Sequence, residues 1–387
     1  MLISNSIYSS QTISNSNRHE VSEDYRNNDD QINQLLENPP SLRNNVKLRE
    51  AVAETATSNK EKEIADSLLN SIDKSAIELE TINGWTSGGV GMFTSALRLM
   101  FENISKDGII GIEKEDLFQI LLLDVMVHKD EYGLSGWYEA NQTQITHLLE
   151  SLGSGSHGLH EDDYDTPLEL ANTTAKVIES LFRSINLERI SNTVAYDVIK
   201  LLNLNTYQGA NELYKEIRDN YHRPDGWIIF NDSNEKAENL SPLLRLFILS
   251  KVLENEPTIT QEELNEILIE NISTIDNFIR DKFKYQVESE IENIPLSIDW
   301  LIKDTQWQIQ PGEADKGGHG GQLDWFGDGI DISVLEQLYK NFPPRVLSDE
   351  DIKEINRIGD NVKMIMQTLK YWFQILRDER VAIARNI

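Results

Sequence analysis

The sequence contains no cysteine among its 387 residues. That absence excludes disulfide bonds, thiolate metal sites, iron–sulfur clusters and cysteine nucleophiles. Long apolar runs are also missing, since the best candidate, Leu117 to Val127, is interrupted by Gln119 and Asp124. A membrane-spanning helix needs about 18 or more apolar residues in succession, so we expect no membrane span.

Basic residues are few compared with acidic ones. The chain has 36 Lys and Arg against 65 Asp and Glu, a formal net charge of −29. Nucleic-acid binding requires clustered positive charge to neutralise phosphates, so nucleic acid is not an expected partner. The same argument applies to an anionic membrane surface. The acidic balance favours solubility or a basic protein partner.

Serine and asparagine account for nine of the first twenty residues. This stretch has no basic segment followed by an apolar one, so it is not a Sec-type signal peptide. We predict that residues 1–45 form a disordered polar tail. The alternative interpretation is an uncleaved export signal of the kind that injection-type secretion systems use.

The remainder of the chain is predicted to be mainly α, a helical bundle with a small irregular or α+β middle region. We divide it into an N-terminal helical region (46–155), a middle helical domain with glycine-rich loops (156–345) and a C-terminal coiled-coil helix (346–387). In the first of these regions, apolar residues recur every three or four positions, at Ile64, Leu68, Ile72, Ala76 and Leu79, which is typical of a helix.

Three segments have the residues of helix starts. Thr166 with Glu169 and Thr260 with Glu263 have the spacing of capping boxes, and Pro242 follows Ser241 at a first helical position. Strand patterns are short, at 226–230 and 306–309. Loops are predicted over 153–165 and over the glycine-rich stretch 312–329.

The C-terminal segment carries the clearest pattern in the sequence. From residue 351 to 387 it has no proline, and apolar residues alternate at spacings of three and four, as in a heptad repeat. A helix of this length spans roughly 55 Å, so it must lie against a partner helix, either in the same chain or in an assembly. A second apolar strip, Met366, Phe373, Ile375 and Val381, flanks this seam. We predict that the seam mediates helix pairing through Ile355, Ile358, Val362, Ile365, Leu369, Trp372, Leu376 and Ile383.

Two polar segments contain residues that can ligate metals. His157, His160 and the acidic residues 161–165 offer imidazole and carboxylate groups. Metal ligands need rigid support, however, and this stretch is polar and rich in Gly and Ser, so we predict a solvated loop here. The segment 103–110 resembles half of a calcium-binding loop, but Lys114 stands where a bidentate Glu is required. A turn before a helix explains this segment and the similar one at 328–331. We therefore assign no metal or cofactor.

The sequence contains none of the common nucleotide-binding, hydrolase or metalloprotease motifs. Its seven histidines and 65 acidic residues make chance pairs plentiful, so we assign no catalytic residue. We expect a protein that is not an enzyme and that acts through protein–protein interaction.

The last sixty residues resemble the hydrophilic translocators of type III secretion systems, the needle-tip and filament proteins of the IpaD/SipD, LcrV and EspA/SseB groups. The shared layout is a Gly/Asp-rich turn, a short helix opening at Ile330 to Leu335, and a long C-terminal coiled-coil helix. The acidic composition, the absence of cysteine and the Ser/Asn-rich start are similar as well. The resemblance covers about 55 residues and rests on pattern rather than on a diagnostic motif.

This resemblance implies a secreted, mechanical protein at the bacterial cell surface. The chain would leave the bacterium unfolded, refold outside, and dock its long helix on needle or translocator proteins or on copies of itself. An early helix would pair with the last one, and residues 46–82 are the candidate. Two alternatives remain: an effector delivered by the same route, with the 157–165 cluster as its site, and a cytosolic helical regulator of secretion.

Overall fold

A computed structural model describes residues 59–106, 108–160, 164–230, 237–310, 320–327 and 329–385. The described residues are mainly helical, which confirms the predicted fold class. The expected polar tail and the start of the first expected helix, residues 46–58, lie outside the described residues. None of the described helices is long and apolar enough to cross a membrane.

The chain forms two compact units. Among the described residues, one unit combines 59–79 with 355–385, and the other comprises those between 80 and 354. Helices α3 (Asn59–Ser87) and α15 (Asp349–Arg385) each contribute residues to both units. The predicted boundary between residues 155 and 156 lies inside the second unit.

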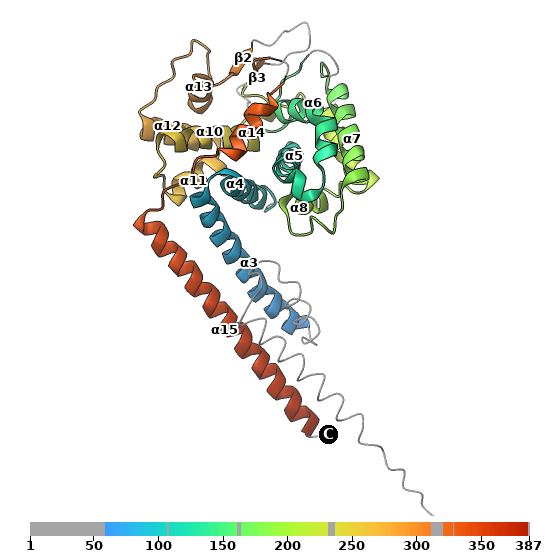
Figure 1. Ribbon diagram of the computed structural model, residues 1–387, viewed down its shortest axis with the longest axis vertical. Helices are drawn as coiled ribbons and strands as arrows, with labels where there is room; N and C mark the ends of the chain where they lie inside the picture. Colours follow the sequence, from blue (N-terminus) through green and yellow to red (C-terminus); the bar gives the residue numbers. More distant parts are fainter. Residues whose placement is uncertain are drawn as a thin grey trace, which may run out of the picture. The chain divides into compact units, whose positions relative to one another are not determined.

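The second unit contains a succession of helices joined by short connections (Figure 1). In chain order they are α4 (Gly89–Ile104), α5 (Glu113–Tyr132), α6 (Ser135–Ser151), α7 (Pro167–Ser184), α8 (Val194–Leu201), α9 (Tyr207–Asn220), the short 3-10 turn η1 (Pro224–Gly226), α10 (Pro242–Asn255), α11 (Gln261–Leu268), α12 (Ile272–Phe283), α13 (Leu296–Ile302) and α14 (Ile332–Lys340).

Helix α5 lies at the centre of this unit. Every residue from Glu115 to Met126 is buried, because α4, α6, α8 and α10 pack around it. The two polar residues that interrupt its apolar run have partners inside the core. Gln119 donates to the carbonyl oxygens of Leu149 (2.7 Å) and Leu152 (3.1 Å), and Asp124 accepts from the hydroxyl of Tyr132 (2.7 Å). The apolar run is therefore a core helix.

The predicted helix starts are confirmed by their caps. Thr166 accepts a hydrogen bond from the amide of Glu169 (3.2 Å) at the start of α7. At α11 the capping box is complete, with Thr260 accepting from the amide of Glu263 and Glu263 accepting from the amide of Thr260. Ser241 caps α10 by accepting from the amide of Leu244 (3.4 Å). Local sequence thus determines where these helices begin.

A small antiparallel sheet covers part of the second unit. Its strands β1 (Ile229–Phe230), β2 (Trp307–Gln310) and β3 (Gly320–Trp325) have the order β1-β3-β2. Strand β1 lies within the predicted segment 226–230, and β2 overlaps the predicted segment 306–309. The prediction of a loop over 312–329 is wrong for β3, because pairing with the flanking strands holds this glycine-rich segment extended.

Candidate functional site

The predicted interaction helix pairs with an earlier helix inside the first unit. Helices α3 and α15 run in opposite directions side by side (Figure 1). Their buried contact consists of Ala65, Leu69 and Ile72 from α3 and Leu369, Phe373 and Leu376 from α15. Apolar residues at heptad spacing meet in this way in antiparallel helix pairs.

The predicted seam residues lie on the inward side of α15. Four of them are buried: Ile358, Val362, Leu369 and Leu376. Ile355, Ile365 and Trp372 are half-buried. Ile383 lies within α15, but its side chain is outside the described part of the chain. On α3 the predicted residue Ile64 is 48% exposed, and its neighbour Ala65 is buried instead.

A different apolar stripe on α15 faces away from α3. Met364, Tyr371 and Ile375 are 58%, 65% and 41% exposed. At 100° per residue, they lie roughly 140° around the helix from the seam. The second strip expected from the sequence is therefore only partly exposed, since Phe373 is buried and Met366 is half-buried in the pair. The side chain of Val381 is outside the described residues.

The predicted 153–165 loop is buried over residues 153–158, so a solvated loop is the wrong interpretation for this stretch. The reason is a set of hydrogen bonds to two carboxylates at the start of α5. Glu115 accepts from the amide of Gly153 (3.0 Å), and Asp116 accepts from the amide (2.8 Å) and hydroxyl (2.6 Å) of Ser154. Gly153 has φ 96°, a conformation that favours glycine.

The two histidines of this loop belong to separate polar clusters. His157 is fully buried, with Nε2 2.8 Å from Oε2 of Glu115 and Nδ1 2.7 Å from the carbonyl oxygen of Tyr221. His160 lies instead beside Glu150 and Asp324. Asp165 is exposed, and residues 161–163 are outside the described part.

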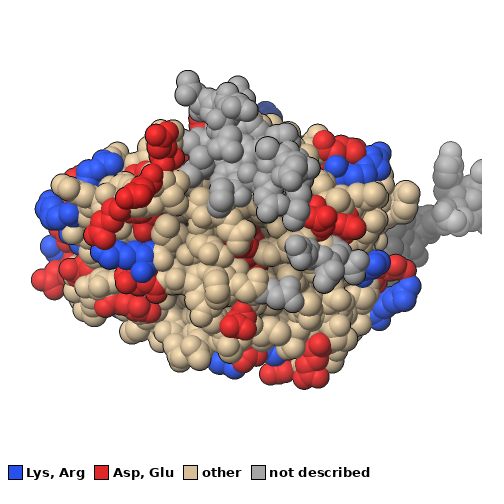
Figure 2. Space-filling model, turned by 90° about the horizontal axis from the view of Figure 1, so that it is seen from above, with Lys and Arg blue, Asp and Glu red and all other residues tan. Residues whose placement is uncertain are grey.

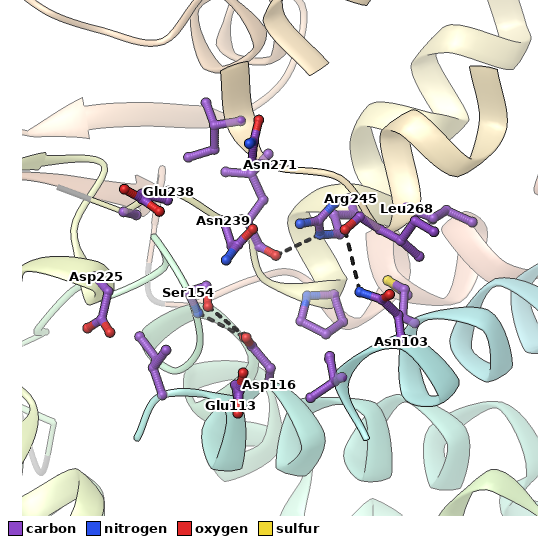
Figure 3. Close-up of a pocket in the computed structure, with 18 of the residues that line it drawn as sticks. Asn103, Glu113, Asp116, Ser154, Asp225, Glu238, Asn239, Arg245, Leu268 and Asn271 are labelled. Atoms are coloured by element: carbon purple, nitrogen blue, oxygen red, sulfur yellow. Dashed lines mark hydrogen bonds between the residues drawn. The ribbon is translucent and has the colours of Figure 1, made fainter. Parts of the chain in front are cut away.

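A cavity of about 1030 Å³ lies between α4, α5 and the segments that flank α10 and α11. Asp116 and Ser154 lie on one side of it, and Asn239 and Asn271 on the other (Figure 3). Arg245 on its wall is engaged by backbone, since Nε donates to the carbonyl oxygen of Leu240 (2.8 Å). The described lining is mainly polar and carries several carboxylates.

Burial changes the acidity of one carboxyl in this lining. It raises the pKa of Asp116 to about 7, and the two hydrogen bonds from Ser154 oppose that rise. A carboxyl that titrates near neutrality can hold or release a proton at a cavity wall.

The segment with half of a calcium-loop pattern makes hydrogen bonds within the protein. Glu113 Oε2 accepts a hydrogen bond from the amide of Ile110 (3.0 Å), and the side chain of Asn103 donates to the carbonyl oxygen of Ile269 (3.5 Å). Asp107 and Asp328, which belong to the two predicted turns, are outside the described residues. Helices α5 and α14 begin soon after these turns.

On the face of the protein seen in Figure 2, Lys and Arg lie among Asp and Glu around the edge, and the described middle of the face is largely uncharged. The described part of this face therefore presents no concentrated basic patch for phosphate.

No family model, curated protein or solved structure matches this chain.

Proposed function

We propose that the protein is a secreted assembly component of a bacterial type III secretion apparatus, of the needle-tip or translocator kind. It acts by protein–protein contact along α15. One observation carries the proposal: α15 buries a heptad seam against α3 and exposes the apolar stripe formed by Met364, Tyr371 and Ile375. This is the early-helix and last-helix pairing that the resemblance implies.

The proposed partner surface is a helix of a needle or translocator subunit. Met364, Tyr371 and Ile375 are spaced by seven and four residues, the spacing at which one helix contacts another along its length. Singly exposed apolar residues are common on protein surfaces, but an aligned series along one helix favours an interaction site. Aromatic residues such as Tyr371 often anchor such contacts.

The test uses substitutions that change the stripe and leave the seam intact. We expect Tyr371→Glu with Ile375→Glu to preserve secretion and the helical content of the purified protein, but to abolish its attachment to isolated needles. Gln374→Glu is the matched control, because Gln374 is exposed on the same helix turn outside the stripe. Needle attachment by the double variant at the level of the control would refute the proposal.

A second candidate function follows from the cavity next to Asp116. A delivered effector needs convergent polar groups in a pocket, and this cavity provides them where the 157–165 cluster does not, because His157 is buried outside the described lining. Secretion without needle attachment in the unmodified protein would favour this candidate. Absence from the culture supernatant would favour the cytosolic regulator instead.

A further inference from the structure

Three potential metal ligands from separate segments meet in the second unit. Glu150 lies in the last turn of α6, His160 in the loop that follows, and Asp324 on β3. Nε2 of His160 is 3.1 Å from Oε1 of Glu150 and 3.3 Å from Oδ1 of Asp324. One ligand atom from each residue lies within 4.8 Å of the other two.

The burial of two carboxylates in this cluster destabilises the folded state unless a cation lies beside them. Glu150 is 0% exposed and Asp324 is 5% exposed. Within the described residues, the ion pairs of both carboxylates are with His160, and neither involves a Lys or Arg. Two buried carboxylates therefore face one imidazole, an arrangement that strongly favours a further positive charge.

In each carboxylate, one oxygen accepts a hydrogen bond from the protein and the other accepts none from the described residues. Oε1 of Glu150 accepts from the amide of Trp325 (2.6 Å), and Oδ2 of Asp324 accepts from the side-chain amide of Gln308 (3.2 Å) and from that of Gln310. Among the described residues, none donates a hydrogen bond to Oε2 of Glu150 or Oδ1 of Asp324. Buried oxygens in this state point to a ligand.

We propose that Glu150, His160 and Asp324 bind a divalent transition-metal ion, for which Zn²⁺ is the best match. Imidazole nitrogen and carboxylate oxygen are ordinary zinc ligands, and two carboxylates balance the charge of the ion. Ligand atoms about 2.1 Å from a tetrahedral zinc are roughly 3.4 Å apart. The distances from Nε2 of His160 to Oε1 of Glu150 (3.1 Å) and to Oδ1 of Asp324 (3.3 Å) are close to that separation. Oε1 of Glu150 also accepts from the amide of Trp325, so the ion would contact this oxygen alone or together with Oε2.

Neighbouring residues fix these ligands in place. The amide of Leu159 donates to Oε1 of Gln322 (3.0 Å), which ties the loop to β3 next to the cluster. The amide of His160 donates to the carbonyl oxygen of Tyr164 (3.1 Å). Strand register places Gln308 opposite Asp324. Such hydrogen bonds orient metal ligands before the ion arrives. A bound ion would join α6, the loop and β3, and would stabilise the folded state by mass action.

The experiment uses the full chain without an affinity tag, treated with a chelator and then dialysed. We expect Zn²⁺ to bind with a stoichiometry of one in calorimetry and to raise the melting temperature. We also expect Co²⁺ to give visible absorption bands of a low-symmetry nitrogen–oxygen site. Asp324→Asn and His160→Gln should each weaken Zn²⁺ binding by more than about 100-fold, because each removes a ligand.

His128→Gln is the matched control, since His128 is a half-buried histidine paired with an Asp in the same unit. It should bind Zn²⁺ as the unmodified chain does. If the unmodified chain shows no Zn²⁺ binding and no Co²⁺ bands, the proposal is wrong. Undiminished binding by both ligand variants would overturn it equally. If a variant does not fold, the Co²⁺ spectrum of the unmodified chain still shows whether a nitrogen–oxygen metal site is present.

Discussion

Asp116 shows how burial can make the stability of this protein depend on pH. Its pKa is about 7 in the folded protein, against an ordinary value of 3.8, chiefly because burial disfavours the charged form. The folded state therefore binds a proton more tightly than the unfolded state. The resulting stabilisation is complete below about pH 4 and is lost as the pH rises towards 7.

Replacing Asp116 by Asn should remove this dependence. Asn keeps an acceptor for the amide of Ser154 and cannot ionise, so we expect Asp116→Asn to gain about 1 to 3 kcal/mol relative to the unmodified protein between pH 4.5 and pH 7.5. Urea unfolding at both pH values measures the difference. Asn239→Ser, an uncharged change in the same cavity, is the control, and an equal pH dependence in both variants would contradict the prediction.

His157 and Glu115 form a fully buried pair, and the loss of one partner should be more harmful than the loss of both. His157→Ala leaves the Glu115 carboxylate buried without its imidazole, which costs about 3 to 5 kcal/mol. Adding Glu115→Gln removes the charge and should restore part of that stability. Chemical unfolding of the three variants gives the result. A double variant less stable than His157→Ala would show that the pair is not the cause.

The sequence identified His157 and His160 as candidate site residues, but it did not identify the residues that they contact. It marked His157 and His160 as one cluster because they are neighbours in the chain. The structure separates them, since Glu115, Glu150 and Asp324 come from other segments. No local pattern marks Asp324, because its position opposite Gln308 arises from strand pairing.

Among the elements, α15 was predicted well because a heptad pattern is local information. Its buried side follows from the spacing of its own residues, and so do the capped starts of α7, α10 and α11. The facing side of α3 was less predictable. Apolar or small residues occupy both 64 and 65, and only the position of α15 determines that Ala65 faces inward. Strand β3 was missed because glycine usually indicates a loop.

The two faces of α15 should respond differently to truncation. Leu369 is 0% exposed, so Leu369→Ala should destabilise the α3–α15 pair by about 2 to 5 kcal/mol. Met364→Ala, on the exposed stripe, should change stability by less than about 0.5 kcal/mol. Hydrogen exchange of amides in residues 59–79 reports the loss of pairing. Equal effects of the two substitutions would show that the seam is not the contact.

On the scale of the whole molecule, the two units differ in how they are stabilised. Helix α5 is enclosed by several helices, whereas the described core of the first unit consists of residues from only α3 and α15. We expect amides of residues 365–376 to exchange at least about 10-fold faster than those of residues 117–126, because a two-helix contact opens more readily. Native-state hydrogen exchange of the full chain measures both. Equal protection would mean that the units unfold together.

The pairing of α3 with α15 can form only after nearly the whole chain has been synthesised. The three α3 residues of the contact, Ala65, Leu69 and Ile72, are made early, and their partners follow only after the whole of residues 80–354. A ribosome makes the chain from its N-terminus, so the first half of this contact is released long before the second. Any product that stops short of Leu369 presents an uncovered apolar strip, the feature that chaperones and proteases recognise.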